Sequence, residues 1–147
     1  MMVAKRRSLM RPPKKKGDIS QAYFIARCLE LDWSVSVPVG DCDRYDAIID
    51  KGNGLERVQI KTGRLRSGAV VFPTRSCTYH VPKGCPTKNT SRSYKGEVEW
   101  FGVFCPDLKK CFMVPAEKVG PRSVNLRVED AKNGRKAKIR WAKDFEI

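Results

Sequence analysis

The first regular pattern in the chain is an apolar repeat at helical spacing. Over residues 18–31 (DISQAYFIARCLEL), one side of a helix would carry the apolar positions Ile19, Ala22, Tyr23, Ala26 and Leu29. Asp18 stands where an N-cap residue belongs, and Gln21 follows three residues later, as in a capping box. The pattern therefore predicts an amphipathic helix that begins at Asp18.

After this helix the period of the pattern falls to two. The alternation over residues 33–39 (WSVSVPV) predicts a half-buried strand, which Pro38 restricts to a sheet edge or a strand end. Apolar runs at 46–50 and 55–62 predict two more strands, and the Lys-Gly-Asn-Gly sequence at 51–54 is typical of a hairpin turn between them. One helix followed by a three-stranded meander is the expected core of an α/β or α+β domain.

Further strands are expected downstream, and no internal repeat divides the chain. Apolar segments at 69–73, 98–105 and 111–115 each have the length and composition of a strand. Near the C-terminus, residues 123–129 and 137–141 predict a last hairpin, turned at Asn133-Gly134. The sheet should therefore contain mixed strands beyond the meander.

The composition fits one soluble globular domain with a polyanionic partner. Among 147 residues, 41% are hydrophobic, and 30 Lys or Arg against 16 Asp or Glu give a net charge of +14. No run of about 18 apolar residues suggests a membrane helix, and no apolar stretch of a secretory signal follows the basic N-terminus. We therefore expect an intracellular protein, in the cytoplasm, the nucleoid or an organelle, with reduced cysteines and no membrane contact.

Two segments contain basic residues without any acidic ones. Residues 1–16 (MMVAKRRSLMRPPKKK) include two adjacent prolines and are expected to form a flexible basic arm ahead of a domain at 17–147. The alternative is a solubilising or organelle-targeting extension. Residues 62–95 are also free of acidic side chains, and the part at 74–94 is rich in Ser, Thr, Pro, Gly and Asn, which predicts a loop-rich basic insert.

Three polar residues are predicted to meet on the central hairpin. Gln59 and Lys61 lie two apart on one strand and so share a face, and counting outward from the turn places Asp46 opposite Gln59. A carboxylate, an amide and an ammonium group on one patch are the layout of a metal-dependent phosphodiesterase. Asp46 would bind Mg²⁺, with the Ile60 backbone carbonyl as a further ligand, and Lys61 would orient the attacking water or neutralise the transition state. The alternative is a merely solvated face of a strand.

The motifs that contain these residues resemble a known family of nucleases. They are GDISQ at 17–21, SVPVGD at 36–41, RYD at 44–46, RVQIKTG at 57–63, YKGEVE at 94–99 and FCP at 104–106. Together they resemble the PD-(D/E)XK nuclease superfamily, and within it the homing endonucleases encoded in group I introns. The resemblance implies a restriction-endonuclease-like core, with an N-terminal helix followed by a β-meander.

The resemblance also implies roles for individual residues. Asp46 takes the place of the metal ligand, Gln59 the first position of the Q-x-K motif and a further metal ligand, and Lys61 that of the catalytic lysine. Gln21 stands where the family has an acidic residue on the first helix, and an amide cannot supply that negative charge. Tyr45 replaces the family's usual proline, and Gln59 replaces its usual Asp or Glu. Both replacements resemble those of the intron-encoded branch.

The function implied is that of a site-specific endonuclease for double-stranded DNA, with Mg²⁺ or Mn²⁺ and no small-molecule cofactor. Because both strands must be cut, we expect a homodimer or a homotetramer. The expected DNA-binding residues are Lys14, Lys15, Lys16, Arg64, Arg66, Arg75, Lys83, Lys88 and Arg92. The alternatives are a structure-selective nuclease such as a Holliday-junction resolvase, a catalytically inactive DNA-binding module of the same fold, and an RNA-associated basic protein.

A zinc site is a weaker alternative use of the cysteines. Cys77, His80 and Cys85 lie close in sequence, and Cys105 and Cys111 could complete a ligand set. Their spacing matches no standard zinc finger, and His80 is the only histidine of the chain. Buried or loose thiols are the simpler interpretation.

Overall fold

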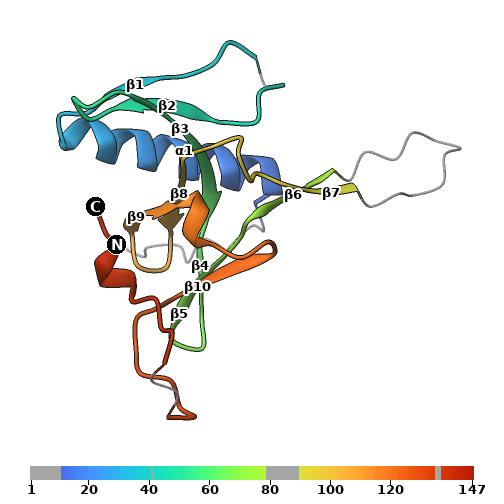
Figure 1. Cartoon of the computed structure of the whole chain (residues 1–147), viewed down its shortest axis with the longest axis vertical. Coiled ribbons are helices and arrows are strands. Elements are labelled where there is room, and N and C mark those ends of the chain that lie inside the picture. The colour runs from blue at the N-terminus through green and yellow to red at the C-terminus, as the bar shows by residue number, and fades with distance from the viewer. Residues whose placement is uncertain (1–10, 41, 79–89, 135–136) are drawn as a thin grey trace, which may run out of the picture.

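A computed structural model describes residues 11–40, 42–78, 90–134 and 137–147 (Figure 1). These residues form one α-helix, ten strands and two short 3₁₀ helices. The elements are α1 (Pro13–Glu30), β1 (Ser34–Ser36), β2 (Ala47–Asp50), β3 (Leu55–Thr62), β4 (Arg64–Arg66), β5 (Ala69–Pro73), β6 (Arg75–Thr78), β7 (Thr90–Ser93), β8 (Trp100–Cys105), β9 (Lys110–Pro115), η1 (Ala116–Lys118), β10 (Ser123–Arg127) and η2 (Ala142–Asp144).

Helix α1 begins five residues before the predicted start. Its N-cap is Pro12, which makes no side-chain cap, and Pro13 occupies the first turn. A proline is tolerated there because its missing N–H would have no partner within the helix. Asp18 and Gln21 therefore lie inside the helix, so the predicted cap and capping box at these residues are wrong. The basic residues 14–16 are helical as well, which corrects the expectation that the flexible arm extends to residue 16.

The main sheet has five strands in the order β1-β2-β3-β8-β9. The first three form the predicted antiparallel meander, β3 pairs with β8 in parallel, and β9 returns antiparallel to β8. Helix α1 lies along one face of this sheet (Figure 1), where Phe24 and Cys28 pack against Ala47, Ile49 and Val58. Gly102 on β8 leaves the space that the ring of Phe24 fills. The resulting α+β architecture agrees with the predicted fold class.

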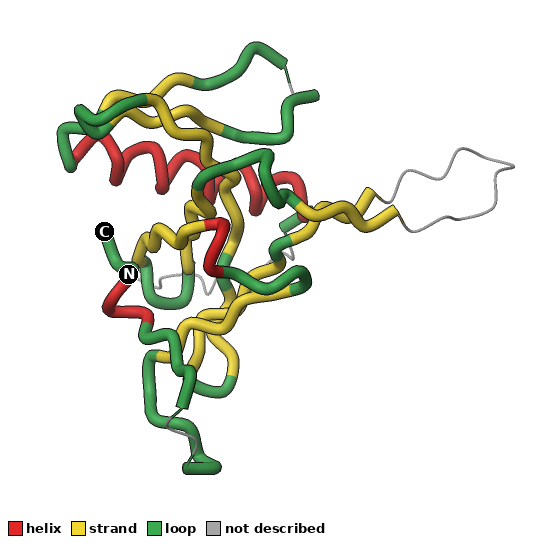
Figure 2. The backbone as a smooth tube through the Cα atoms, in the orientation of Figure 1, coloured by secondary structure: helices red, strands yellow, loops and turns green. Residues whose placement is uncertain are grey.

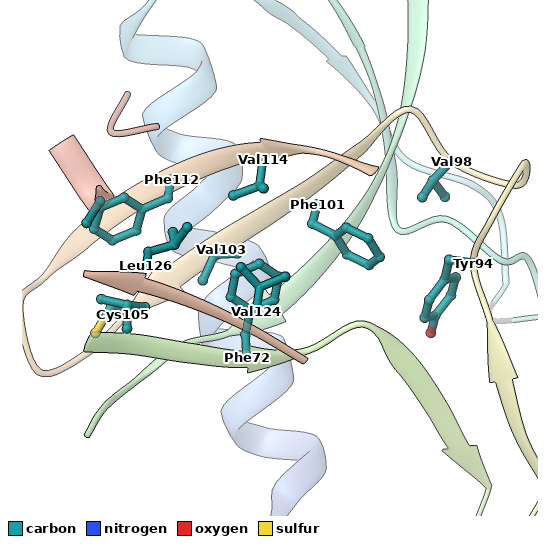
Figure 3. Close-up of a cluster of buried hydrophobic side chains, with 12 residues drawn as sticks. Phe72, Tyr94, Val98, Phe101, Val103, Cys105, Phe112, Val114, Val124 and Leu126 are labelled. Atoms are coloured by element: carbon teal, nitrogen blue, oxygen red, sulfur yellow. The ribbon is translucent and has the colours of Figure 1, made fainter. Parts of the chain in front are cut away.

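A second, three-stranded sheet covers the other face of β8 and β9. Its order is β10-β5-β4, and both pairings are antiparallel. Figure 3 shows the two layers meeting in a cluster of buried side chains, with α1 behind the main sheet. The cluster includes Phe72, Phe101, Val103, Phe112 and Leu126. The main sheet is thus buried on both faces at β8 and β9.

The predicted C-terminal hairpin does not form. Strand β10 pairs with β5 instead, because its alternating Val124 and Leu126 side chains complete the cluster between the two sheets. The chain does turn near Gly134, which has a φ of +67°, but residues 137–140 form no strand. Among the described residues, the returning chain pairs with β10 through an isolated parallel bridge between Arg127 and Trp141.

The described part of the basic insert is more regular than expected. Strands β6 and β7 pair antiparallel as the base of a hairpin that leaves the body of the molecule (Figures 1 and 2). The middle of the insert, residues 79–89, lies outside the described residues. Along the described part of the chain, none of the helices is long and apolar enough to cross a membrane.

Candidate functional site

The β2–β3 hairpin sets the register of the candidate site. Its turn uses Gly52 and Gly54 at positive φ (+96° and +124°), a conformation that glycine adopts without strain. The ladder then pairs Ala47 with Val58, and the Asp46 N–H donates to the Val58 carbonyl at 2.8 Å. Asp46 therefore comes opposite Gln59 at the end of the hairpin, as predicted from the count along the two strands.

The Asp46 carboxylate is held by two donors from β3. The Gln59 side-chain amide donates to Asp46 Oδ2 at 2.5 Å, and the Ile60 backbone N–H donates to the same oxygen at 2.7 Å. Burial raises the pKa of Asp46, although the Ile60 N–H bond, the nearby positive charge of Lys61 and the Gln59 bond each lower it. The site thus pays a desolvation penalty for an ionised carboxylate, which a bound cation would offset.

The oxygen donors near Asp46 fit a hard divalent cation. The Asp46–Val58 bond shows that the peptide groups of Val58, and by alternation those of Ile60, point toward the β2 side of β3. Strand β2 begins at Ala47, so the Ile60 carbonyl faces the space beside Asp46 rather than a ladder partner. The Gln59 amide uses its nitrogen for Asp46, which leaves its oxygen as the acceptor. One carboxylate and two neutral oxygens are suitable protein ligands for Mg²⁺, because this ion completes its coordination shell with several waters.

Lys61 lies on the same face of β3 as Gln59, and that face is packed. Val58 and Ile60 point to the α1 side, whereas Gln59 is only 9% exposed on the opposite side. Lys61 Nζ donates to the hydroxyl of Tyr94 at 3.2 Å and lies 4.6 Å from the centre of that ring. The alternative of a merely solvated strand face does not describe Gln59 and Lys61.

Gln21 lies on α1, which packs on the opposite face of the sheet from Gln59 and Lys61. The preceding residue, Ser20, is buried, and its hydroxyl forms a 2.6 Å hydrogen bond with the hydroxyl of Thr62, the residue after Lys61. The turn of α1 that contains Gln21 is therefore fixed beside the end of β3, and Gln21 itself is half-buried. Its part in the site stays a prediction.

Some of the predicted DNA-binding residues share one cleft. Lys16 of α1 and the exposed Arg64 and Arg66 of β4 line a cleft of about 440 Å³ next to Thr62. Lys14 and Lys15 are exposed in the first turn of α1. Arg75 and Arg92 are instead on the β6–β7 hairpin, and Lys83 and Lys88 lie outside the described residues.

Two residues at the site were not singled out from the sequence. The Arg44 guanidinium donates to Glu97 at 2.6 Å, to the Ser76 hydroxyl at 2.8 Å and to the Ser93 carbonyl at 2.9 Å. It also lies 4.1 Å from the centre of the Tyr94 ring. Arg44 and Tyr94 each belong to a motif quoted above, but a motif does not show that they pack on each other beside Lys61.

The described cysteines do not form a metal site. Cys105 packs in the cluster between the two sheets, whereas Cys111 packs on the α1 side, so the two thiols face opposite layers. Burial raises the pKa of Cys111 to about 11 and that of Cys28 to about 12. No group of three or more His, Cys, Asp or Glu side chains suitable for a metal is present among the described residues. His80, Cys85 and the side chain of Cys77 lie outside them.

Comparison with known proteins places the chain beside nucleases. Residues 11–147 match the family model of the PD-(D/E)XK endonucleases. The structure of a bacterial homing endonuclease, I-Ssp6803I, is similar over 92% of this chain and 89% of that chain, with a TM-score of 0.71 and 25% sequence identity. No curated protein sequence matches.

Proposed function

Because the chain belongs to the PD-(D/E)XK endonuclease family, as its motifs predicted, we propose that it is a metal-dependent endonuclease that cuts duplex DNA at specific sites. The observation that supports this proposal most is the Asp46 carboxylate, oriented by Gln59 and Ile60 beside the Lys61 ammonium group. The similarity to a bacterial homing endonuclease supports DNA as the substrate. The proposal includes that the protein is encoded in an intron and that it cuts DNA at specific sites.

We assign the chemistry to the end of β3. Asp46, the Ile60 carbonyl and the Gln59 amide oxygen would hold Mg²⁺ or Mn²⁺. The bound ion would lower the pKa of a coordinated water and stabilise negative charge on the phosphate. Lys61, on the same face as Gln59, would orient that water or neutralise the charge of the transition state. Gln59 has a second task, since its amide donates to Asp46 and fixes the carboxylate in place.

The basic cleft beside the site would hold the DNA backbone. Lys16, Arg64 and Arg66 line it and together present three positive charges next to Thr62, one residue after Lys61. Cations of this kind bind phosphates and release counterions. Hydrolysis of both strands needs two copies of the site, so a homodimer or a homotetramer is the proposed working unit.

The test is cleavage of a long duplex DNA library by the wild-type chain and two variants. We expect Mg²⁺-dependent cleavage into discrete fragments and no cleavage by Asp46→Asn, which keeps the shape of the side chain but loses its charge. Gln21→Glu restores the carboxylate that the family has on α1 and should raise the cleavage rate. A four-way junction offered in competition separates a resolvase from a duplex endonuclease. No cleavage by either the wild type or Gln21→Glu would contradict the enzymatic proposal.

One observation favours a second candidate, a DNA-binding module without catalysis. Gln21, on the turn of α1 that is fixed beside Thr62, is an amide and supplies no second carboxylate to accompany Asp46. Under this alternative, the Asp46→Asn variant and the wild type would bind duplex DNA equally and neither would cut it. A gel-shift titration run beside the cleavage assay measures both properties.

A further inference from the structure

Tyr94 makes two contacts with the ammonium group of Lys61. Lys61 Nζ donates to the Tyr94 hydroxyl at 3.2 Å, and the same nitrogen lies 4.6 Å from the ring centre, within range of a cation–π interaction. Tyr94 directly follows β7 and is only 5% exposed. A buried side chain from the insert therefore contacts the lysine assigned to the chemistry.

The ring of Tyr94 is itself held on several sides. Phe101 meets it edge to face, with ring centres 5.8 Å apart, as Figure 3 shows for the two labelled side chains. The Arg44 guanidinium lies over the ring at 4.1 Å. The hydroxyl thus has a defined position relative to β3.

The Arg44 guanidinium is fixed in turn by the base of the β6–β7 hairpin. It donates to the Ser76 hydroxyl and the Ser93 carbonyl, one on each strand, and to Glu97 beyond the hairpin. Arg92 on β7 pairs with the same Glu97 carboxylate. These contacts join the hairpin base to the Tyr94 ring and so to Lys61.

A lysine at a reacting centre needs such support because its four-carbon stem is flexible. A misplacement of about 1 Å can lower a rate by roughly 10²-fold. We propose that Tyr94 is a positioning residue that holds the Lys61 ammonium group at its place beside Asp46, with its hydroxyl as the group that matters. This inference rests on the proposed function. The competing explanation is that Tyr94 serves only as part of the core, in which case its ring matters and its hydroxyl does not.

The substitution Tyr94→Phe separates these explanations. It keeps the ring, the packing on Phe101 and the stacking of both cations, and it removes only the hydroxyl. We expect the single-turnover cleavage rate at saturating DNA to fall about tenfold, as for the loss of a hydrogen bond to a charged group. The Kd for DNA and the melting temperature should stay at their wild-type values. Tyr23→Phe is the matched control, because Tyr23 is a half-exposed tyrosine on α1 that stacks on Phe104.

A double-mutant cycle shows whether Tyr94 acts through Lys61. In a Lys61→Ala background, Tyr94→Phe should cause no further loss of rate, because the group that it positions is absent. Wild-type cleavage by Tyr94→Phe, or the same fold loss with and without Lys61, would overturn the inference. A fall in melting temperature that matches the fall in rate would show a role in the core only and would also overturn it.

A second measurement does not depend on cleavage. The ¹⁵N NMR signal of the Lys61 ammonium group, assigned from its loss in Lys61→Ala, should shift or broaden in Tyr94→Phe and stay unchanged in Tyr23→Phe. If neither the wild type nor Gln21→Glu cuts DNA, the proposed function fails and this signal alone decides the inference. An ammonium signal that is the same in the wild type and Tyr94→Phe would then overturn the positioning role.

Discussion

Gly102→Ala should destabilise the domain, because the added methyl group would clash where α1 packs on the main sheet. A Cβ atom at Gly102 would lie 2.5 Å from Phe24 Cζ and 2.7 Å from both Cε atoms of that ring. Carbon atoms pack best at about 3.5–4.0 Å, so the ring would have to move by about 1 Å. Phe24 is completely buried, so its ring would have to move against the side chains packed around it. Overpacking of this kind costs about 1–3 kcal/mol, which lowers the melting temperature by about 2–12 °C in a domain of this size.

A glycine-to-alanine substitution in α1 provides the control, because it should stabilise the protein rather than destabilise it. Gly17 is helical, and no atom lies within 4 Å of the position of its Cβ, so Gly17→Ala should stabilise by about 0.5–1 kcal/mol. Thermal unfolding of both variants measures the difference. In a Phe24→Leu background the cost of Gly102→Ala should shrink, since leucine has no aromatic ring for the new methyl group to meet. Equal melting temperatures for Gly102→Ala and the wild type would refute the packing of α1 described here.

Three further predictions concern charges and thiols. Because burial raises the pKa of Asp46 in the folded state, ionisation of Asp46 destabilises the fold as the pH rises through that pKa. Without metal, Asp46→Asn should therefore have a melting temperature no lower than that of the wild type at pH 7–8. Mg²⁺ should stabilise only the wild type. The Arg44 bond lowers the pKa of Glu97. Arg44→Ala should therefore speed hydrogen exchange in β6 and β7 at neutral pH, by a factor that shrinks in acid as Glu97 becomes protonated. Burial raises the pKa of Cys28 to about 12, so iodoacetamide at pH 8 should label the exposed Cys42 in the native protein and spare Cys28, as peptide mass mapping would show.

The local features of the site could be predicted from the sequence. Strand alternation and the position of the turn were enough to place Asp46 opposite Gln59, and the structure joins these side chains at 2.5 Å. Strand β3 has the bounds that its apolar run indicated. Both features depend on contacts within one hairpin, where the separation along the chain fixes the separation in space.

The features that could not be predicted depend on contacts between distant segments. The alternating pattern of β10 is compatible with the predicted hairpin to residues 137–141 and equally with pairing to β5. Packing in the cluster around Phe72 and Leu126 selects the pairing with β5. The contact of Tyr94 with Lys61 spans 33 residues and depends on how the insert returns to the sheet. The early start of α1 was missed for a local reason, because the two prolines indicated a break where they in fact form the first turn.

The central claim is that the end of β3 beside Asp46 binds a divalent cation. Anomalous diffraction from crystals of the wild-type chain soaked in Mn²⁺ tests it directly, since the signal locates the ion among the side chains. We predict one Mn²⁺ ion between the Asp46 carboxylate and the Ile60 carbonyl, at the roughly 2.0–2.2 Å typical of small hard cations, and no peak there in Asp46→Asn. Ordered crystals in saturating Mn²⁺ with no peak beside Asp46, or with the same peak in Asp46→Asn, would contradict the account.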